Sequence, residues 1–395
     1  MHLGDSVHTG PPMRLIHTAD IHLDTCYATS RMAPDFGNCR RQGLREVFHA
    51  IVTRAAAWPA DALLIAGDLF DLDRVRRDTI AFLQAEFEAV RPLPVLIAPG
   101  NRDPYVADSP YATAPWPNNV VIFDGPVWAS RALKDGKLMV HGFGFDGAVA
   151  GANPFGKLHV TDDRDRVQVA VAHGAAEGLL PPGKAPCAPF KASAVALKGL
   201  AYLALGHLHA MTPVEGGADT IMYYSGSPEG HGFDELGLHY YLEVEIDEHG
   251  VRVTPKVSSR VIYAEYTIDC SAFDTIEQVV EAVRAVGAQA ERPQVARITL
   301  TGPCPSDLYI NVPAVHGAAA SAFEALQVIS KIEPMDDFEE LARENTCFGI
   351  FIRKMNEELR DAPDETRRQF AKRARELGLV AYRQRQPAIC ELDED

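Results

Sequence analysis

ALLIAGD, residues 62–68, decides the fold: it is a short apolar run that ends in a glycine and an aspartate. Four further apolar runs, on either side of it along the chain, also end in a polar side chain or a glycine-rich turn. They are RLIHTAD (14–20), PVLIAPGN (94–101), VQVAVAHG (167–174) and YLALGH (202–207). Short apolar runs that are closed by turn residues predict buried β-strands.

Helical patterns separate the first three of these runs, at about residues 39–57 and 75–90. Strand alternating with helix predicts a layered α/β core. Later runs, including VVIFD, KLMVHGFGF, IMYYSGS and LHYYLEVEID, have no long helices between them. We therefore expect added antiparallel strands that complete a second sheet. The expected fold class is α/β: a two-sheet β-sandwich flanked by helices.

The length predicts more than one domain, because 395 residues exceed the roughly 250 to 300 at which single cores stop growing. Near residue 260 the sequence pattern changes to that of a small α+β unit. From about residue 336 the pattern is helical and amphipathic. We expect four parts: a flexible N-terminal extension (1–12), a catalytic domain (13–260), a small α+β domain (261–335) and a helical C-terminal region (336–395).

Composition excludes several classes of protein. The seven cysteines are scattered and never form a C-x-x-C pair, so a disulfide framework and a structural zinc site are not expected. No apolar run reaches the roughly 18 residues of a membrane span, and the first residues lack the apolar core of a signal peptide. A cytoplasmic protein without membrane contact is therefore expected.

The formal charge of −16 counts against a generally basic, DNA-coating surface, so any nucleic-acid contact must be local. Residues 353–386 form the one basic segment, with ten Lys or Arg against six acids. This segment is either an ordinary solvated helix face or a contact surface for nucleic acid or a partner protein.

Candidate metal ligands lie at or just beyond the carboxyl ends of the predicted strands, the edge at which sites of α/β sheets gather. Two carboxylates, an amide and four imidazoles suit manganese, iron or zinc better than calcium or magnesium. Seven ligands exceed the needs of one ion, so we expect two divalent ions bridged by Asp68, able to activate water and clamp phosphate oxygens. The ligands, in chain order, are Asp20, His22, Asp68, Asn101, His173, His207 and His209.

Each motif alone has a plainer interpretation. Asp68 could cap the following helix, Asn101 could stabilise a turn, and the two histidines of GHLH could belong to a core. Five motifs in this order, each after a predicted strand, favour a metal centre.

The series D-x-H, GDLFD, GN-x-D, H and GHLH resembles the calcineurin-like metallophosphoesterase superfamily. Within it, ALGHLH followed by YYSGSPEGHGFDELG resembles the SbcD-type DNA double-strand-break repair exonucleases. The resemblance covers roughly residues 14–260, and the unit at 261–335 matches that family's capping domain in size and position.

The resemblance implies a metallophosphoesterase fold and a manganese-dependent nuclease that acts on DNA ends or single strands, with a coiled-coil ATPase as partner. Iron and zinc remain alternatives, and a homodimer is left open. One metal would take Asp20, His22, Asp68 and His209, and the other would take Asp68, Asn101, His173 and His207.

One position departs from the family pattern: Arg102 stands where a histidine follows the asparagine. Arginine cannot give up a proton at ordinary pH, but it can bind a phosphate or a developing negative charge. Asp103 either orients Arg102 or stabilises the turn. His231, in EGHGFDE, is either a replacement for the missing histidine or a surface residue.

Other side chains are weaker candidates. Asp71 and Asp73 either bind water near the phosphate or are solvated loop acids, and Tyr105, Tyr111 and Trp116 either stack on bases or anchor their loop. Two alternatives to a nuclease stay open: a phosphoesterase for small phosphodiesters or phosphomonoesters, and a slow DNA-end-binding subunit of an ATPase complex.

Overall fold

The computed structural model describes residues 11–27, 35–147, 154–161, 163, 165–180, 187–195, 197, 199–304, 310–334 and 338–384. Most of the expected N-terminal extension therefore lies outside the described residues. The chain divides into a first unit, Met1–Tyr263, and a second unit, Ala264–Asp395. No helix in the described part of the chain is both long and apolar enough to cross a membrane.

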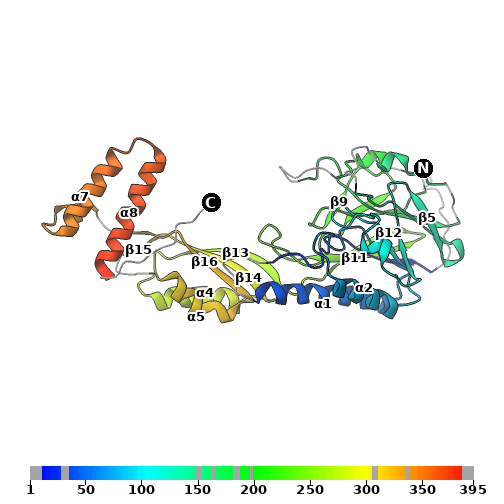
Figure 1. Cartoon of the computed structure of the whole chain (residues 1–395), viewed down its shortest axis with the longest axis horizontal. Coiled ribbons are helices and arrows are strands. Elements are labelled where there is room, and N and C mark those ends of the chain that lie inside the picture. The colour runs from blue at the N-terminus through cyan, green and yellow to red at the C-terminus, as the bar shows by residue number, and fades with distance from the viewer. Residues whose placement is uncertain are drawn as a thin grey trace. The chain divides into compact units, whose positions relative to one another are not determined.

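The first unit contains two six-stranded sheets (Figure 1). In the first sheet the central strands are parallel, and the last two strands of the unit add antiparallel to one side. Its order is β12 (Gly250–Val257), β11 (Tyr240–Asp247), β1 (Met13–Thr18), β2 (Ala62–Ile65), β3 (Val95–Ile97) and β4 (Val120–Ile122).

The second sheet is also parallel at its centre, with antiparallel strands at its two edges. Its order is β5 (Ala129–Leu133), β6 (Leu138–Gly142), β7 (Val167–His173), β8 (Tyr202–Gly206), β10 (Ile221–Tyr224) and β9 (Thr212–Val214).

This arrangement confirms the expected two-sheet α/β fold but corrects the expectation that the later strands are added antiparallel strands of a second sheet. β4 and β11 join the first sheet, β6 runs parallel to β7 and β10 runs parallel to β8, while β6 with β5 and β10 with β9 are antiparallel pairs. In the described residues of the crossovers between β6, β7 and β8, short 3₁₀ turns stand at Pro154–Lys157 and Ala192–Val195, and those residues form no long helix. The helical period that normally signals parallel pairing is therefore missing from the sequence.

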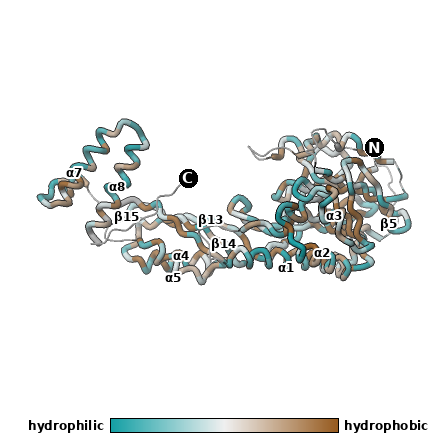
Figure 2. The backbone as a smooth tube through the Cα atoms, in the orientation of Figure 1, coloured by the Kyte–Doolittle hydropathy of each residue, from teal (hydrophilic) through white to brown (hydrophobic). Residues whose placement is uncertain are grey.

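Side chains alternate between the two faces of the strands in the first sheet, so each face packs against a different layer. Ile16 and Leu63 face α1 (Phe36–Ala57) and α2 (Arg77–Ala89), whereas Leu15 and Leu64 pack between the two sheets with residues of β6, β7 and β8. Figure 2 shows hydrophobic residues concentrated along these strands. A third apolar cluster covers the outer face of the second sheet and includes Cys187. These layers hold the carboxyl ends of both parallel sheets in fixed positions.

The second unit has its own core. A sheet of order β13 (Ile262–Asp269), β14 (Gln294–Thr301) and β16 (Ala325–Ser330) packs with α4 (Ile276–Ala288) and α5 (Val312–Ala319). Three helices follow: α6 (Phe338–Arg343), α7 (Cys347–Arg360) and α8 (Glu365–Gln384).

Candidate metal centre

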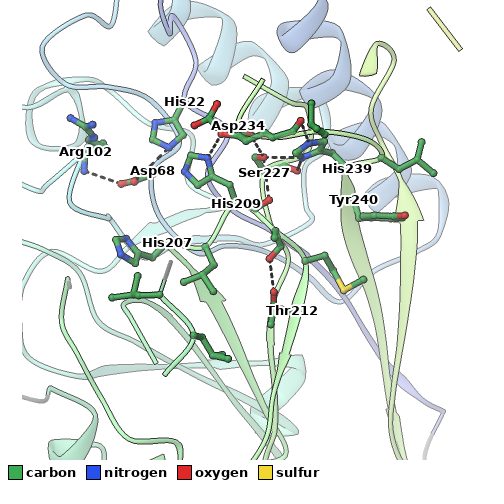
Figure 3. A pocket seen from close by; sticks show the side chains of 18 of the residues that line it. His22, Asp68, Arg102, His207, His209, Thr212, Ser227, Asp234, His239 and Tyr240 are labelled. Atoms are coloured by element: carbon green, nitrogen blue, oxygen red, sulfur yellow. Dashed lines mark hydrogen bonds and ion pairs between the residues drawn. The ribbon is translucent and has the colours of Figure 1, made fainter. Parts of the chain in front are cut away.

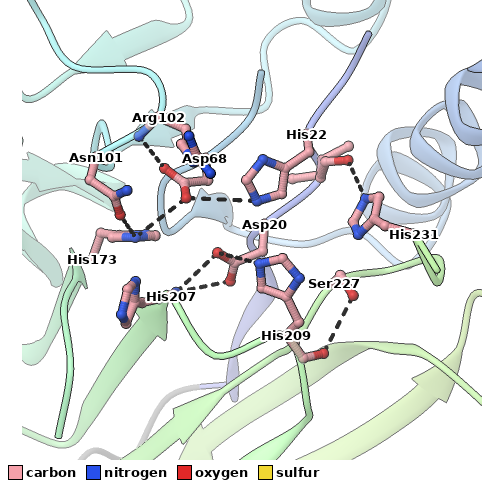
Figure 4. Close-up of polar contacts among 12 residues, drawn as sticks. Asp20, His22, Asp68, Asn101, Arg102, His173, His207, His209, Ser227 and His231 are labelled. Atoms are coloured by element: carbon pink, nitrogen blue, oxygen red, sulfur yellow. Dashed lines mark hydrogen bonds and ion pairs between the residues drawn. The ribbon is translucent and has the colours of Figure 1, made fainter. Parts of the chain in front are cut away.

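The seven predicted ligands come together at the strand ends of the first unit (Figure 4). Asp20 and His22 follow β1, Asp68 follows β2 and Asn101 follows β3. From the second sheet, β7 ends at His173, and His207 and His209 follow β8. Both sheets therefore contribute side chains to one site. Their role as metal ligands stays a prediction that this geometry supports.

The backbone at these positions is unusual. Asp20, His22 and Asp68 have φ angles of 52°, 51° and 51°, and His207 has a φ of 110°. Non-glycine residues rarely adopt such angles, and each costs on the order of 1 to 3 kcal/mol. Strain of this kind persists where the surrounding structure over-determines it, and it clusters at functional sites.

Two glycines make room for Asp68. Gly67 has a φ of 86°, and a Cβ at Gly100 would overlap the Asp68 carboxylate and lie 2.9 Å from His173 Nδ1. Only glycine therefore lets the chain after β3 approach Asp68 this closely.

Three of the histidines are oriented in the same way. In each, Nδ1 contacts an outer acceptor: His22 the Asp71 carboxylate at 2.7 Å, His209 the Glu235 carboxylate at 2.6 Å and His173 the Ala66 carbonyl at 3.0 Å. An acceptor at Nδ1 places the proton there and leaves the lone pair of Nε2 for the centre.

The inward-facing nitrogens lie close to oxygen atoms. Nε2 of His22 and Nε2 of His173 lie 3.7 and 3.6 Å from Asp68 Oδ2, and Nε2 of His209 lies 4.0 Å from Asp20 Oδ1. His22 Nε2 is buried without a hydrogen-bond partner, which is costly for a polar atom unless a cation binds it. The donor set and this orphaned nitrogen fit divalent metal ions.

The remaining two candidates lie among the same atoms. Asn101 Oδ1 is 2.9 Å from His173 Nε2. His207 donates its backbone N–H to both oxygens of the Asp20 carboxylate, at 3.1 and 2.9 Å, and its ring meets the His173 ring edge-on at 5.2 Å. Backbone hydrogen bonding thus orients Asp20 from the β8 side.

Charge is concentrated at the centre. Burial raises the pKa of Asp20, and the nearby histidines only partly oppose this effect. Burial would also raise the pKa of Asp68, but His173, His22 and the Arg102 amide outweigh it and lower that pKa. Burial alone would lower the pKa of His22, yet the bond to Asp71 and the carboxylates raise it to about 9. Two buried carboxylates side by side favour a bound cation.

Asp103 does not orient Arg102, which corrects one of the two interpretations from the sequence. Its buried carboxylate accepts the backbone N–H groups of Asp68 (3.0 Å), Leu69 (2.8 Å) and Gly100 (2.6 Å) and the Tyr111 hydroxyl (2.7 Å). Asp103 therefore ties the loop after β2 to the loop after β3.

Arg102 is exposed at the edge of the site. Its backbone N–H donates to Asp68 Oδ1 at 2.8 Å, while its guanidinium makes no hydrogen bond or ion pair with any described residue. The guanidinium is thus available to an anionic group in the pocket.

His231 lies behind His22 and His209 rather than in the pocket lining. Its ring centroid is 5.4 Å from that of His22 and 5.6 Å from that of His209. Nδ1 contacts Glu235 at 3.0 Å and Nε2 contacts the Ile21 carbonyl at 3.2 Å. With both ring nitrogens engaged, His231 supports the ligands and is poorly placed to replace the missing histidine.

Among the weaker candidates, one acid contacts a predicted ligand, another is exposed, and the three aromatics pack in or against the core. Asp71 is the partner of His22, whereas Asp73 has a side chain that is 75% exposed. Tyr111 is buried against Phe70 and Trp116, so these aromatics anchor their loop, and Tyr105 packs beside them against the same core.

Sequence reasoning missed two residues, Glu235 and Cys187. Glu235 accepts hydrogen bonds from His209, His231 and Ser227, and these histidines lower its pKa against the effect of burial. In the sequence, the one feature that pointed to Glu235 was its i, i+4 spacing from His231. Cys187 lies near His173 and His207, and burial together with Asp68 and Asp20 raises the pKa of its thiol to about 12.

The centre opens into a pocket with a volume of about 760 Å³ (Figure 3). Its lining includes His22, Asp68, Asn101, Arg102, His207 and His209. The lining also includes apolar side chains: Leu179, Leu180, Leu208, Met211, Leu236 and Leu238. A ligand can therefore present a polar group to the centre and an apolar group to these side chains.

Known proteins are similar to this chain. An uncharacterized metallophosphoesterase of Bacillus subtilis (strain 168), YhaO, is 25% identical over 329 residues, which span 80% of this chain and 77% of the relative. A dimetal phosphatase from Danio rerio aligns with a TM-score of 0.42 at 11% identity, covering 63% of this chain and 97% of the other. Purple acid phosphatase PPD1 of yellow lupin (Lupinus luteus) aligns with a TM-score of 0.35 at 13% identity, covering 62% of this chain and 52% of the other.

The family model for calcineurin-like phosphoesterases matches residues 13–211, half of the chain. This range contains all seven predicted ligands, Arg102 and Asp103. The superfamily resemblance seen in the sequence is confirmed, while the narrower resemblance to SbcD-type exonucleases stays a prediction. The chain belongs to the calcineurin-like phosphoesterase family.

Proposed function

We propose that this protein is a two-metal-dependent phosphodiesterase that cleaves DNA, with manganese as the proposed metal and iron or zinc as alternatives. The observation that carries the phosphodiesterase part is the convergence of seven donor side chains on one site, five of which line an open pocket with a guanidinium at its edge. Bound divalent ions would supply an activated water and polarise the phosphate.

The chain's own residues prepare this chemistry. Asp71 and Glu235 hold the rings of His22 and His209 by hydrogen bonds to Nδ1, and Asp103 fixes the two loops that carry Asp68 and Asn101. Such outer partners orient ligands before the substrate arrives.

Arg102 binds a non-bridging phosphate oxygen through charge-assisted hydrogen bonds. Because a guanidinium keeps its proton, Arg102 stabilises developing negative charge and does not protonate the leaving oxygen. Proton donation to the leaving group then falls to solvent in the open pocket.

DNA as substrate is supported by the resemblance of ALGHLH (204–209) and YYSGSPEGHGFDELG (223–237) to SbcD-type exonucleases. Local basic charge is also present: Arg367, Arg368 and Arg373 on α8 have side chains that are 53%, 55% and 53% exposed, and a phosphate would compete with the ion pairs that they form with Glu358, Glu365 and Glu376. Exposed arginines suit phosphate contacts that do not depend on base sequence.

A coiled-coil ATPase is the proposed partner, and a cytoplasmic location is proposed with it. α8 offers exposed apolar side chains beside its arginines, with Phe370 58% and Tyr382 52% exposed. A surface of this kind suits helix packing with another chain. Co-purification of the full chain with its ATPase, compared between wild type and Phe370→Glu, tests this assignment.

The nuclease proposal is tested with purified full-length protein, Mn²⁺ and end-labelled single-stranded or duplex DNA. Cleavage is expected in wild type and in the exposed-residue control Asp73→Asn, and its loss is expected in Asp68→Asn. If no DNA is cut at any enzyme excess, with or without the ATPase, the DNA assignment is wrong.

A second candidate function keeps the metals but acts on small phosphodiesters or phosphomonoesters. The apolar side chains in the pocket lining favour it, because Leu179, Leu236 and Leu238 suit an aryl or alkyl group better than a second backbone phosphate. Turnover of bis-p-nitrophenyl phosphate far above DNA cleavage would select this candidate. DNA binding without turnover of either substrate would instead select the slow DNA-end-binding subunit.

A further inference from the structure

Cys187 lies beside two of the predicted metal ligands. Its sulfur, a ring nitrogen of His173 and a ring nitrogen of His207 all lie within 4.8 Å of one another. The Cys187 side chain is buried, as is His173. One sulfur and two nitrogens at this spacing are close enough to share one cation.

The backbone fixes this thiol in place. The Ala175 amide, two residues after the end of β7, donates to the Cys187 carbonyl at 2.8 Å, and the Phe190 amide donates to the Ala175 carbonyl at 3.0 Å. Ala188, the next residue, has a φ of 41°, an angle that a non-glycine residue adopts only under constraint. Cys187 is thus hydrogen-bonded to the segment that directly follows the strand ending at His173.

We propose that Cys187 is a further metal ligand, on the side of the centre formed by His173 and His207, and that its sulfur shifts this position toward zinc or iron. The proposal rests on the metal centre of the proposed function but not on its substrate. Thiolate is a softer donor than imidazole or carboxylate, and soft donors select zinc and iron over manganese. On binding, the sulfur–metal bond replaces the S–H bond and the proton leaves to solvent.

The competing explanation is that Cys187 is only a small apolar residue. It belongs to the cluster that contains Phe155 and Phe190, and buried cysteine commonly packs in this way. Core packing alone predicts no spectroscopic interaction between the sulfur and a metal, so the two explanations are separable.

Cobalt substitution separates them. Full-length protein is stripped of metal and reloaded with two equivalents of Co²⁺, and the near-ultraviolet spectrum is recorded. We expect a thiolate-to-cobalt charge-transfer band in wild type and in Cys39→Ser, whose cysteine is exposed on α1, and no band in Cys187→Ser. On the zinc-loaded wild type, X-ray absorption is expected to show one sulfur at about 2.3 Å.

Two cobalt ions bound to wild type without this band overturn the proposal and leave the metal centre standing. A wild type that binds no divalent metal overturns the metal centre and this proposal together. Both conclusions use wild type alone, so they hold even if Cys187→Ser fails to fold.

Metal competition gives an independent measurement. The preference of the protein for Zn²⁺ over Mn²⁺ is expected to fall at least about tenfold in Cys187→Ser, the lower end of the loss caused by removing even an outer partner of a ligand. An unchanged preference in a folded variant overturns the assignment.

Discussion

Nδ1 of His22 lies 2.7 Å from the Asp71 carboxylate, while Nε2 on the opposite side of the same ring is buried without a hydrogen-bond partner. The carboxylate holds the proton on the outer nitrogen and leaves the inner nitrogen as a donor for a cation. His209 and Glu235 repeat this relationship at 2.6 Å. The site is therefore organised by its outer partners as much as by its ligands.

Replacing Asp71 tests this organisation. We expect Asp71→Asn to weaken divalent metal binding by about 10- to 100-fold, because the amide lacks the charge that holds and strengthens His22 as a ligand. Isothermal titration calorimetry with Mn²⁺ measures the change. Asp73→Asn is the matched control, since that carboxylate is exposed and should leave the affinity unchanged. Equal affinity in Asp71→Asn and wild type would show that His22 does not depend on Asp71.

A substitution at Asp68 tests metal binding apart from the stability of the metal-free protein. Asp68→Asn removes a buried carboxylate whose pKa is lowered by His173, His22 and the Arg102 amide, so the metal-free variant should be less stable than wild type. The metal-induced rise in Tm should shrink, because a metal ion that binds only the folded state stabilises that state more when it binds more tightly. Thermal unfolding with and without Mn²⁺ measures both effects. A full metal-induced rise in Asp68→Asn would exclude Asp68 as a shared ligand.

Much of the site could be predicted because its residues follow parallel strands. Asp20, Asp68 and Asn101 lie at one edge for topological reasons, so their spacing along the chain does not matter. Glu235 could not be predicted, because it reaches His209 from a loop 26 residues away. Cys187 could not either, since its position depends on hydrogen bonds between loops. The parallel pairing of β6, β7 and β8 was missed because the described residues between these strands form loops and short 3₁₀ turns in place of the usual helices.

We expect Asp103 to contribute to the free energy of unfolding and Arg102 to contribute to turnover. Asp103→Ala leaves the buried N–H groups of Asp68, Leu69 and Gly100 without an acceptor. Each such group costs on the order of 1 to 3 kcal/mol, so the free energy of unfolding should fall by several kcal/mol. Arg102→Ala should leave it within about 0.5 kcal/mol, as for other exposed positions. Urea denaturation of both variants measures this difference, and similar losses would contradict the separate roles.

Arg102 is expected to matter in turnover. Arg102→Ala should lower kcat/KM for bis-p-nitrophenyl phosphate by about 100-fold, the loss usual for one donor to developing negative charge. Arg102→His should retain more activity and add a dependence on the pH at which the imidazole loses its proton. Steady-state kinetics from pH 5 to 9 measure these effects. If Arg102→Ala matches wild type, the guanidinium does not contact the reacting phosphate.

His17 should make stability depend on pH without affecting the metal ligands directly. Nδ1 of His17 lies 2.8 Å from the Tyr202 hydroxyl and Nε2 lies 3.1 Å from the Leu205 carbonyl, so the neutral ring accepts at one nitrogen and donates at the other. Burial lowers its pKa from 6.5 to about 3, although the bond to Leu205 opposes this effect. As pH falls below 6.5 the unfolded chain therefore binds a proton that the folded protein does not bind.

The contribution of His17 to stability is complete above pH 6.5 and is lost progressively as pH falls toward 3, at up to about 1.4 kcal/mol per pH unit. Urea denaturation of metal-free protein at pH 7.5 and pH 5 should show a smaller drop in His17→Gln than in wild type. His49→Gln, which removes a histidine whose side chain is 61% exposed, should keep the wild-type drop. The same drop in His17→Gln and wild type would mean that His17 takes up its proton equally in the folded and unfolded chains.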